Sequence, residues 1–321
     1  MQRHHLVIHR FPGRVRMLVA ALCAVLLPLA FSASASADST PGPRTWQVAV
    51  GEETRNDAIQ GMAFLPGTVW INQGDTIVWT AKAGEIHTVT FLAAGQSLSQ
   101  PFNPGDAQQL FPQGSSHYDG VSYENSGVMT DEADSGFPAQ TTYTLTFDAT
   151  GDFTYFCLVH GEMMKGVVHV RAAGTPYPFT QKQYNHQAAV QKAAVLADGH
   201  RLWAKTRKDA NNHLVFAGAD DGTAMVMRFI NSHVKIRVGS TVTFMNSGTA
   251  APHTITFGPE PANIFAPSGD PTHFSGQPLN SGILLPGSSF TVTFTKAGTY
   301  HYICALHDYL GMVGTVNVES D

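Results

Sequence analysis

Apolar and polar residues alternate in short runs along most of the chain, which predicts β-strands. The stretch FLPGTVWINQGDTIVW, from Phe64 to Trp79, contains two such runs, and the turn at Gly74 and Asp75 separates them. Residues 143–147 alternate Tyr, Leu and Phe with threonine, as a half-buried strand does. Short strands divided by glycine and proline turns indicate a β-sandwich or barrel, and not a sheet with crossover helices.

The same pattern occurs twice along the chain. The segment that begins at Phe64 matches FINSHVKIRVGSTVTF, which begins at Phe229, without a gap. HTVTF at His87 recurs as HTITF at His253, and YTLTFDATGDFTYFC recurs as FTVTFTKAGTYHYIC. So many matches in the same order predict two copies of one domain.

We expect the two domains at residues 45–172 and 213–321, with a linker over residues 173–212. The linker is rich in alanine and favours one helix, which Thr180 could cap. The apolar face of that helix could pack on either domain or on another chain. Between its first histidine and the strand at 143–147, the first copy carries a long segment rich in Gly, Pro, Ser and Gln. Loops of that length often cover a site or an interface, or are mobile.

The first residues of the chain are typical of an export signal. Basic residues precede an apolar run from Met17 to Phe31, and the small-residue tract SASASA follows. This predicts a signal peptide over residues 1–37, cleaved after Ala37, and a periplasmic, cell-surface or extracellular protein. The apolar run is too short for a lasting membrane span. A net charge of −5 without a long basic run gives no support for nucleic-acid binding.

Each copy also carries a remote histidine and a compact Cys-x2-His loop that a methionine follows. The first set is His87, Cys157, His160 and Met164, with Met163 as a competing methionine, and the second is His253, Cys304, His307 and Met312. Two imidazoles, one thiolate and one weak thioether suit electron-transfer copper, because sulfur stabilises Cu(I) and imidazole also accepts Cu(II). Structural zinc more often takes Cys₄ or Cys₂His₂. A disulfide between the two cysteines would leave their repeated neighbours unexplained.

This pattern resembles the plastocyanin/azurin-type cupredoxins, the blue copper proteins. CALHDYLGMVGTVNV looks like a plastocyanin ligand loop, PHTITF looks like the first-histidine strand, and the resemblance covers roughly residues 45–172 and 213–320. It implies an all-β chain of two tandem Greek-key sandwich domains, each with one type 1 copper near one end. It also implies that His160 and His307 are electron entry points. The family keeps one residue between the axial methionine and a glycine, which favours Met164 over Met163.

Two cupredoxin domains in one chain also occur in copper nitrite reductases and two-domain laccases. Those enzymes place a histidine next to the copper cysteine, whereas here phenylalanine and leucine flank the first cysteine, and isoleucine and alanine the second. We therefore expect a carrier that exchanges electrons with redox partner proteins, and not an enzyme. Copper storage or delivery is a third possibility. Two-domain relatives are often trimers, so a homo-oligomer is an expectation by analogy.

One repeated pair of histidines has no place in this account. His117 and His273 both lie a few residues before a repeated NSG. The ordinary interpretation is a loop hydrogen bond shared by the two copies. The alternative is an extra metal site between domains or between subunits.

Overall fold

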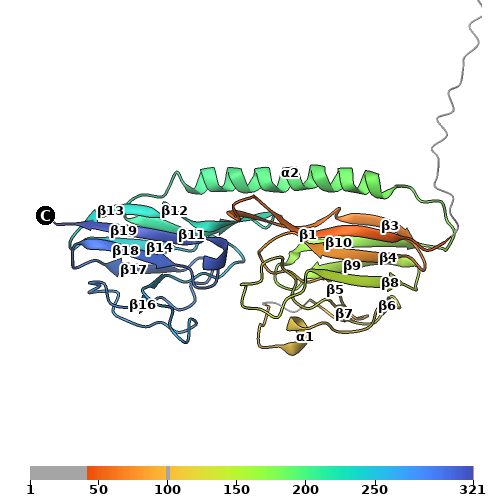
Figure 1. The fold of residues 1–321 in the computed structure, drawn as a ribbon, viewed down its shortest axis with the longest axis horizontal. Helices are drawn as coiled ribbons and strands as arrows, with labels where there is room; N and C mark the ends of the chain where they lie inside the picture. Colours follow the sequence, from red (N-terminus) through yellow and green to blue (C-terminus); the bar gives the residue numbers. More distant parts are fainter. Residues whose placement is uncertain (1–41, 99–101, 321) are drawn as a thin grey trace, which may run out of the picture. The chain divides into compact units, whose positions relative to one another are not determined.

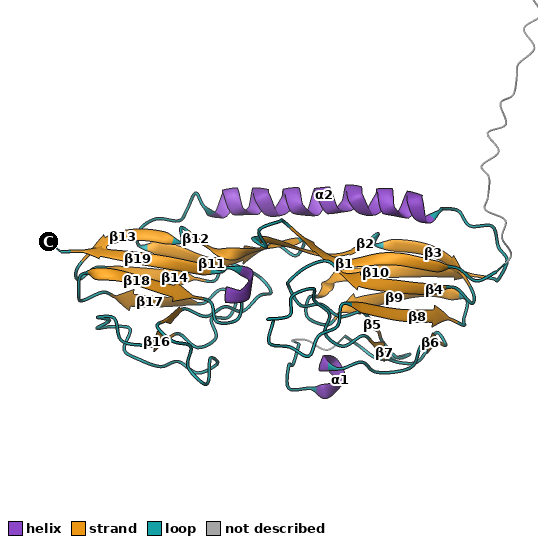
Figure 2. Cartoon of the chain, viewed as in Figure 1, coloured by secondary structure: helices purple, strands orange, loops and turns teal. Residues whose placement is uncertain are grey.

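The computed structural model describes residues 42–98 and 102–320. The expected signal peptide, residues 1–37, lies outside them. Strands dominate the described chain, and one long helix lies between two sets of strands (Figure 1, Figure 2). The expected all-β architecture with one linker helix is therefore confirmed. No helix among the described residues combines the length and the apolarity needed to cross a bilayer.

The first repeat is a sandwich of two sheets. Its strands are β1 Thr45–Glu53, β2 Ile59–Leu65, β3 Thr68–Asn72, β4 Thr76–Ala81, β5 Thr90–Phe91, β6 His117–Tyr118, β7 Glu124–Asn125, β8 Thr142–Phe147, β9 Gly151–Cys157 and β10 Gly161–Arg171. One sheet has the order β2-β1-β4-β8-β6 and the other β3-β10-β9-β5-β7. Neighbours in each sheet are often not consecutive in the chain, as Greek-key connections require. The long insertion also holds a short helix, α1 (Ala107–Leu110).

The second repeat copies this arrangement. Its elements are β11 Leu214–Asp220, β12 Ala224–Ile230, β13 His233–Arg237, β14 Thr241–Met245, β15 Thr256–Phe257, β16 Leu279–Asn280, β17 Ser289–Thr293, β18 Gly298–Ile303, the 3₁₀ helix η1 Asp308–Leu310 and β19 Val313–Glu319. One sheet has the order β17-β14-β11-β12 and the other β13-β19-β18-β15-β16. The two copies that the sequence predicts therefore share their strand pairing, except that an isolated bridge between Phe274 and Phe294 takes the place of β6.

Two strands join the repeats into one sheet. β12 pairs antiparallel with β2, with Ala224 opposite Gly61 and Val226 opposite Ile59. The result is a nine-stranded sheet in the order β17-β14-β11-β12-β2-β1-β4-β8-β6. The sequence contains both strands but does not predict that they pair.

Aromatic side chains fill the space between the sheets at equivalent places. In the first repeat the Trp79 and Tyr155 rings pack edge to face with centroids 5.5 Å apart. Phe244 and Tyr302 make the same contact in the second repeat at 5.0 Å. These rings are fully buried, and edge-to-face packing adds to their hydrophobic stabilisation. The aromatic contacts support the strands that end at the two cysteines.

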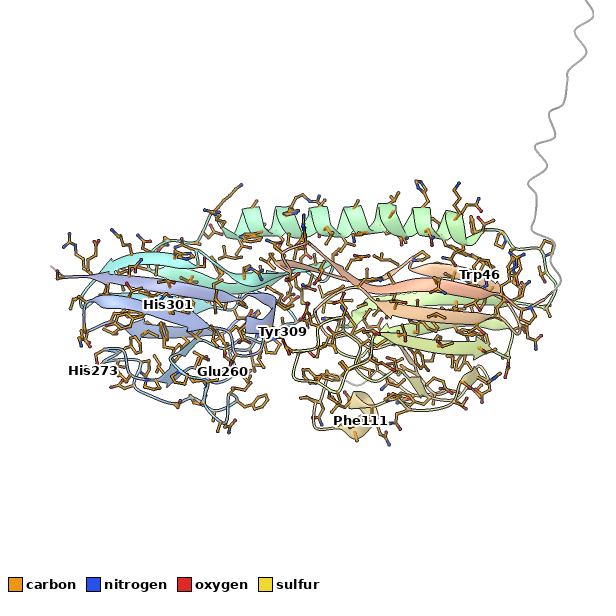
Figure 3. All side chains as sticks on the ribbon, in the orientation of Figure 1. Trp46, Phe111, Glu260, His273, His301 and Tyr309 are labelled. Atoms are coloured by element: carbon orange, nitrogen blue, oxygen red, sulfur yellow. The ribbon has the colours of Figure 1, made fainter. Side chains whose placement is uncertain are left out.

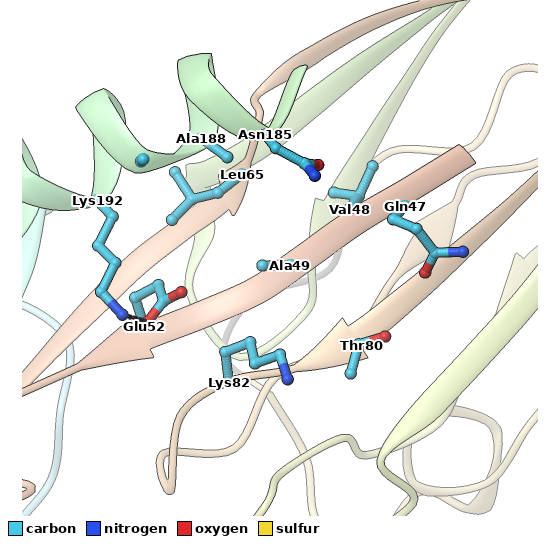
Figure 4. Close-up of a pocket in the computed structure, with 11 residues that line it drawn as sticks. Gln47, Val48, Ala49, Glu52, Leu65, Thr80, Lys82, Asn185, Ala188 and Lys192 are labelled. Atoms are coloured by element: carbon cyan, nitrogen blue, oxygen red, sulfur yellow. Dashed lines mark hydrogen bonds and ion pairs between the residues drawn. The ribbon is translucent and has the colours of Figure 1, made fainter. Parts of the chain in front are cut away.

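The helix α2 (Gln181–Thr206) covers the junction between the repeats. The Thr180 side chain accepts the Gln183 backbone N–H, and Gln183 reaches back to Thr180, which forms a capping box. The helix packs on β1 and β2 of the first repeat and on β11 and β12 of the second (Figure 1). A shallow groove between α2 and β1 is lined by mixed side chains, among them Lys192 and Glu52, which form an ion pair (Figure 4).

Candidate metal centres

In the first repeat, two imidazoles and one thiol converge on a single point. His87 lies just before β5 and pairs with the backbone of Met129, Cys157 ends β9, and His160 lies in the turn before β10. The Nδ1 atoms of His87 and His160 lie 3.9 Å and 3.4 Å from Cys157 Sγ. All three side chains are buried. The sequence predicts these residues as ligands, and the fold brings them together.

The second repeat builds the same cluster. His253 pairs with the backbone of Leu284, Cys304 follows β18, and His307 precedes η1. The Nδ1 atoms of His253 and His307 lie 3.7 Å and 3.4 Å from Cys304 Sγ, and 3.2 Å from each other. In each repeat the three ligand atoms lie within 4.8 Å of one another. Two nitrogens and one sulfur at this separation fit a soft transition metal such as copper.

Backbone and hydroxyl groups hold each sulfur in place. The Thr88 N–H points at Cys157 Sγ at 3.4 Å, and the Thr254 N–H points at Cys304 Sγ at 3.3 Å. The Thr88 hydroxyl accepts the Leu158 N–H, which fixes the residue after the cysteine. Hydrogen bonds of this kind orient a ligand and tune the metal that it holds. Thr88 and Thr254, which follow the first histidine of each site, therefore support the site without being ligands.

The repeated NSG motif anchors the short strand that follows the first histidine in each repeat. Thr90 donates its hydroxyl hydrogen to Asn125 Oδ1 at 2.9 Å, and Thr256 does the same to Asn280 at 2.8 Å. The serine that follows each asparagine accepts the backbone N–H two residues after the histidine. The motif is thus a structural support for the site in both repeats.

Sequence reasoning missed two glycines that the sites require. Gly51 and Gly218 lie at bulges in β1 and β11, with φ of +68° and +70°. A Cβ atom at Gly51 would lie 2.5 Å from His87 Nε2, and one at Gly218 would lie 2.5 Å from His253 Nε2. A glycine inside an alternating run in both copies is the signal that could have identified them, because such glycines mark bulges and close approaches.

Burial keeps the six clustered groups neutral in the metal-free chain. It lowers the pKa of His160 and of His307 to about 4, and raises the pKa of both cysteine thiols to about 11. Burial, with the neighbouring histidine, lowers the pKa of His87 and His253 well below the usual value. Neutral imidazoles are ready ligands, whereas each thiol must lose its proton to a binding metal.

Cys157 and Cys304 are both free and buried, so the described chain has no disulfide between them. The two candidate methionines of the first loop differ in exposure: Met164 is 1% exposed and Met163 is 40% exposed. Met312 is fully buried. The choice of Met164 as axial ligand stays a prediction, and burial favours it.

The repeated histidines at 117 and 273 lie elsewhere. His117 Nδ1 contacts Asp148 at 3.0 Å, and His273 Nδ1 contacts Asp270 at 3.2 Å. Both imidazoles are exposed, and neither belongs to the clusters described above. In Figure 3, His273 lies far from Tyr309, which marks the junction of the repeats. These contacts favour the loop hydrogen bond, although the partner differs between the copies.

A buried carboxyl group, Glu85, lies between the two clusters. Its Oε1 is 4.0 Å from His160 Nε2, and its Oε2 is 3.9 Å from His307 Nε2. The Glu85 side chain is 6% exposed, and burial raises the pKa of its carboxyl to about 8. The two loop histidines thus face the junction rather than open solvent. No sequence pattern pointed to Glu85, because the second copy has Ala251 two residues before its first histidine.

Comparison with known proteins agrees with this geometry. Residues 52–171 and 215–319 each match the family of copper binding proteins, plastocyanin/azurin family. Plastocyanin from Scenedesmus fuscus is 38% identical over 106 residues, which span 32% of this chain and 94% of that protein. The chloroplastic plastocyanin of Tetradesmus obliquus is 32% identical over 151 residues, or 46% of this chain and 96% of that protein.

Solved cupredoxins also match single repeats. A purple cupredoxin from Nitrosopumilus maritimus is 25% identical, with a TM-score of 0.23, and covers 33% of this chain and 98% of that protein. An oxidised amicyanin variant is 23% identical, with a TM-score of 0.24, and covers 35% of this chain and 89% of that protein. The fold and the two clusters define a cupredoxin with two domains. The chain belongs to the plastocyanin/azurin family of copper-binding proteins.

Proposed function

We propose that this chain is an exported electron-transfer protein with one type 1 copper site in each repeat. The observation that carries the proposal is the convergence, in both repeats, of two histidine Nδ1 atoms and one cysteine Sγ within 4.8 Å among buried side chains. Bound copper would supply reversible one-electron chemistry at each point. Burial of the donors excludes water, so the site favours an exchange of electrons over a reaction with solvent.

Eight side chains form the proposed ligand set. They are His87, Cys157, His160 and Met164 in the first repeat, and His253, Cys304, His307 and Met312 in the second. The imidazoles bind through Nδ1, which is the atom that faces sulfur in all four histidines. The rigid surroundings of the sulfur hold one geometry for both oxidation states. We place the domain boundaries at residues 45–172 and 213–321, with the linker over residues 173–212.

The proposal favours a carrier over an enzyme. Apolar residues flank both cysteines, where the two-domain copper enzymes have a histidine that leads to a second metal. An open position for substrate is what copper catalysis needs. Export is proposed from the N-terminal signal pattern. The partners are redox proteins, and the number of chains in an assembly is left to experiment.

Copper content and spectra of the mature protein test the proposal. We expect two coppers per chain in two blue sites, and no type 2 signal in the electron paramagnetic resonance spectrum. Cys157→Ser and Cys304→Ser should each remove one blue site with its type 1 signal, because each removes the sulfur of one site. A type 2 signal, or one blue site only, contradicts the proposal.

A control and one alternative complete the design. The double variant His117→Ala/His273→Ala should keep both coppers, because these exposed imidazoles lie outside the clusters. If that variant lost a metal ion, the interpretation of the two histidines as loop supports would be wrong. Ready loss of Cu(I) from the wild-type protein to a chelator would favour copper delivery over electron transfer.

A further inference from the structure

The two loop histidines meet at one carboxyl group. Glu85 belongs to the first repeat and directs one oxygen towards His160 of its own repeat and the other towards His307 of the second. Glu85 Oε2 is buried and has no hydrogen-bond partner among the described residues. A buried, unpartnered carboxyl oxygen is costly, and the imidazoles of His160 and His307 are the groups placed to satisfy it.

The chemistry of a ligating histidine supplies that partner. When Nδ1 binds a metal, the ring proton must be on Nε2, so each imidazole faces Glu85 as a donor. Metal-bound histidines commonly donate this second N–H to a carboxylate, which orients the ring. The ionised form of Glu85 has two acceptor oxygens and can accept from both rings at once. The contacts of 4.0 Å and 3.9 Å would have to shorten by about 1 Å to become hydrogen bonds.

The surroundings hold Glu85 at this place from both sides. The Tyr309 hydroxyl, from the ligand loop of the second repeat, points at the Gly84 carbonyl at 3.4 Å. A Cβ atom at Gly84 would lie 2.6 Å from Leu310 Cδ2, so glycine lets the two repeats approach closely here without moving that side chain. Arg228 donates to the Leu310 carbonyl at 2.5 Å and also to the Asn56 carbonyl of the first repeat. The junction is therefore a defined contact and not a loose hinge.

We propose that Glu85 links the two copper sites as a positioning residue, so that an electron passes between them within one chain along His160, Glu85 and His307. This inference rests on the proposed function. One electron leaves the reduced site and reaches the oxidised site of the same chain. No bond forms or breaks, no proton has to leave Glu85, and no other reactant is consumed. The side chains at both ends of the path are buried, so direct exchange with a docked partner is not their main role.

The experiment follows electron exchange in a half-reduced chain. A Met312→Gln background gives the second site a different axial donor, which separates the two visible bands and potentials. A radiolytic pulse adds much less than one electron per chain, and the two bands are then followed with time. We expect one band to recover as the other bleaches, at a rate that does not change with protein concentration.

Substitutions at Glu85 give the decisive comparison. Glu85→Leu should slow the exchange about tenfold, the effect on a rate of losing about 1.4 kcal/mol of interaction. Glu85→Gln keeps the shape but presents an amide N–H to one ring N–H, so an intermediate rate is expected. Glu132→Gln changes a neighbouring carboxyl group that does not contact the histidines, and its rate should equal that of the parent.

A second readout does not depend on electron transfer. In the fully reduced, diamagnetic protein, proton–nitrogen correlation NMR should show the Nε2–H groups of His160 and His307. Their protons should exchange slowly with solvent. Glu85→Leu should expose both protons to faster exchange, and a merely structural role for Glu85 would leave them unchanged. A Glu85→Leu rate within about twofold of the parent, with both blue bands intact, overturns the inference. If the parent lacks two blue bands, the proposed function itself has failed.

Discussion

At the scale of single residues, the two adjacent methionines of the first ligand loop show how burial selects a ligand. Met164 is 1% exposed and belongs to the core around Cys157, whereas Met163 is 40% exposed. A thioether can act as a weak axial donor only from inside the site. The family spacing and the burial therefore favour the same methionine, although two residues of one type stand side by side.

This difference makes a paired prediction. Met164→Leu should raise the reduction potential of the first site by about 60 mV, because loss of a donor disfavours Cu(II) by about tenfold. Met163→Leu should leave the potential unchanged, since the Met163 side chain lies beside Gly222 of the second repeat and is 40% exposed. Voltammetry of each variant, with the second site as an internal reference, measures both. A shift in Met163→Leu alone would reverse the assignment.

The bulge glycines make a second prediction at this scale. Gly218→Ala places a Cβ 2.5 Å from His253 Nε2, so the imidazole must move. We expect the blue band of the second site to change, and the free energy of unfolding to fall by about 1–3 kcal/mol more than in the control. The control is Gly239→Ala, which has a similar φ of +84° and nothing within 4 Å of its Cβ. An equal fall in the free energy of unfolding in both variants would mean that backbone strain alone, and not contact with His253, destabilises Gly218→Ala.

The sequence predicts the metal ligands better than the residues that position those ligands. Cys157 and Cys304 hold the same place in two copies, so the repeat itself separates ligands from ordinary core residues. Gly51 and Gly218 give a weaker signal: a glycine inside an alternating run in both copies indicates a bulge, but it does not show which histidine requires it. Glu85 has no counterpart in the second repeat, and its neighbours come from both repeats. A role that depends on the junction cannot be read from one copy of the pattern.

At the scale of elements, α2 is the feature that the alanine-rich linker predicts most directly. Its composition and the Thr180 cap indicate a helix, and the structure confirms one over Gln181–Thr206. The composition does not show which surface it covers. Contacts with strands of both repeats decide that, and Gly199 is a buried position at which the helix packs against Ile59 of β2.

Gly199→Ala tests whether packing or helix propensity dominates there. Alanine favours a helix over glycine by about 1 kcal/mol, which would stabilise the protein. A Cβ at Gly199 would, however, lie 2.3 Å from Ile59 Cγ2, so we expect a net loss of about 1–3 kcal/mol in the free energy of unfolding. Ala193→Gly, at an exposed position of the same helix, reports the propensity term alone. Urea unfolding of both variants shows whether each substitution raises or lowers the free energy of unfolding. A higher free energy of unfolding in Gly199→Ala would contradict the close packing.

At the scale of the whole described chain, the repeats are joined by backbone pairing, by α2 and by one arginine. The pairing of β2 with β12 is antiparallel and in register over three residue pairs. Arg228 contacts the carbonyls of Leu310 and Asn56, which belong to different repeats. These bonds hold the ligand loop of the second repeat against the first, so we expect the two repeats to unfold together.

Arg228→Gln tests that cooperativity. Loss of the hydrogen bonds from a charged donor to the part-buried Leu310 carbonyl and the exposed Asn56 carbonyl should cost about 2 kcal/mol and loosen the junction. In calorimetry, the wild-type protein should give one transition whose calorimetric and van't Hoff enthalpies agree, whereas the variant should give two overlapping ones. Arg237→Gln, at an exposed position on β13, should behave like the wild-type protein. Two separate transitions in the wild-type protein would show that the junction does not couple the repeats.

The pairing of β2 with β12 also bears on solubility. In one repeat alone, β2 would be an edge strand, with a row of unpaired N–H and C=O groups along an apolar stretch. The second repeat covers that edge with β12, so each copy protects the other from adding a foreign strand. A single repeat prepared by itself would expose a self-complementary edge and should associate through it. Duplication of the domain thus removes an aggregation hazard that a lone copy would have to avoid with charges or proline.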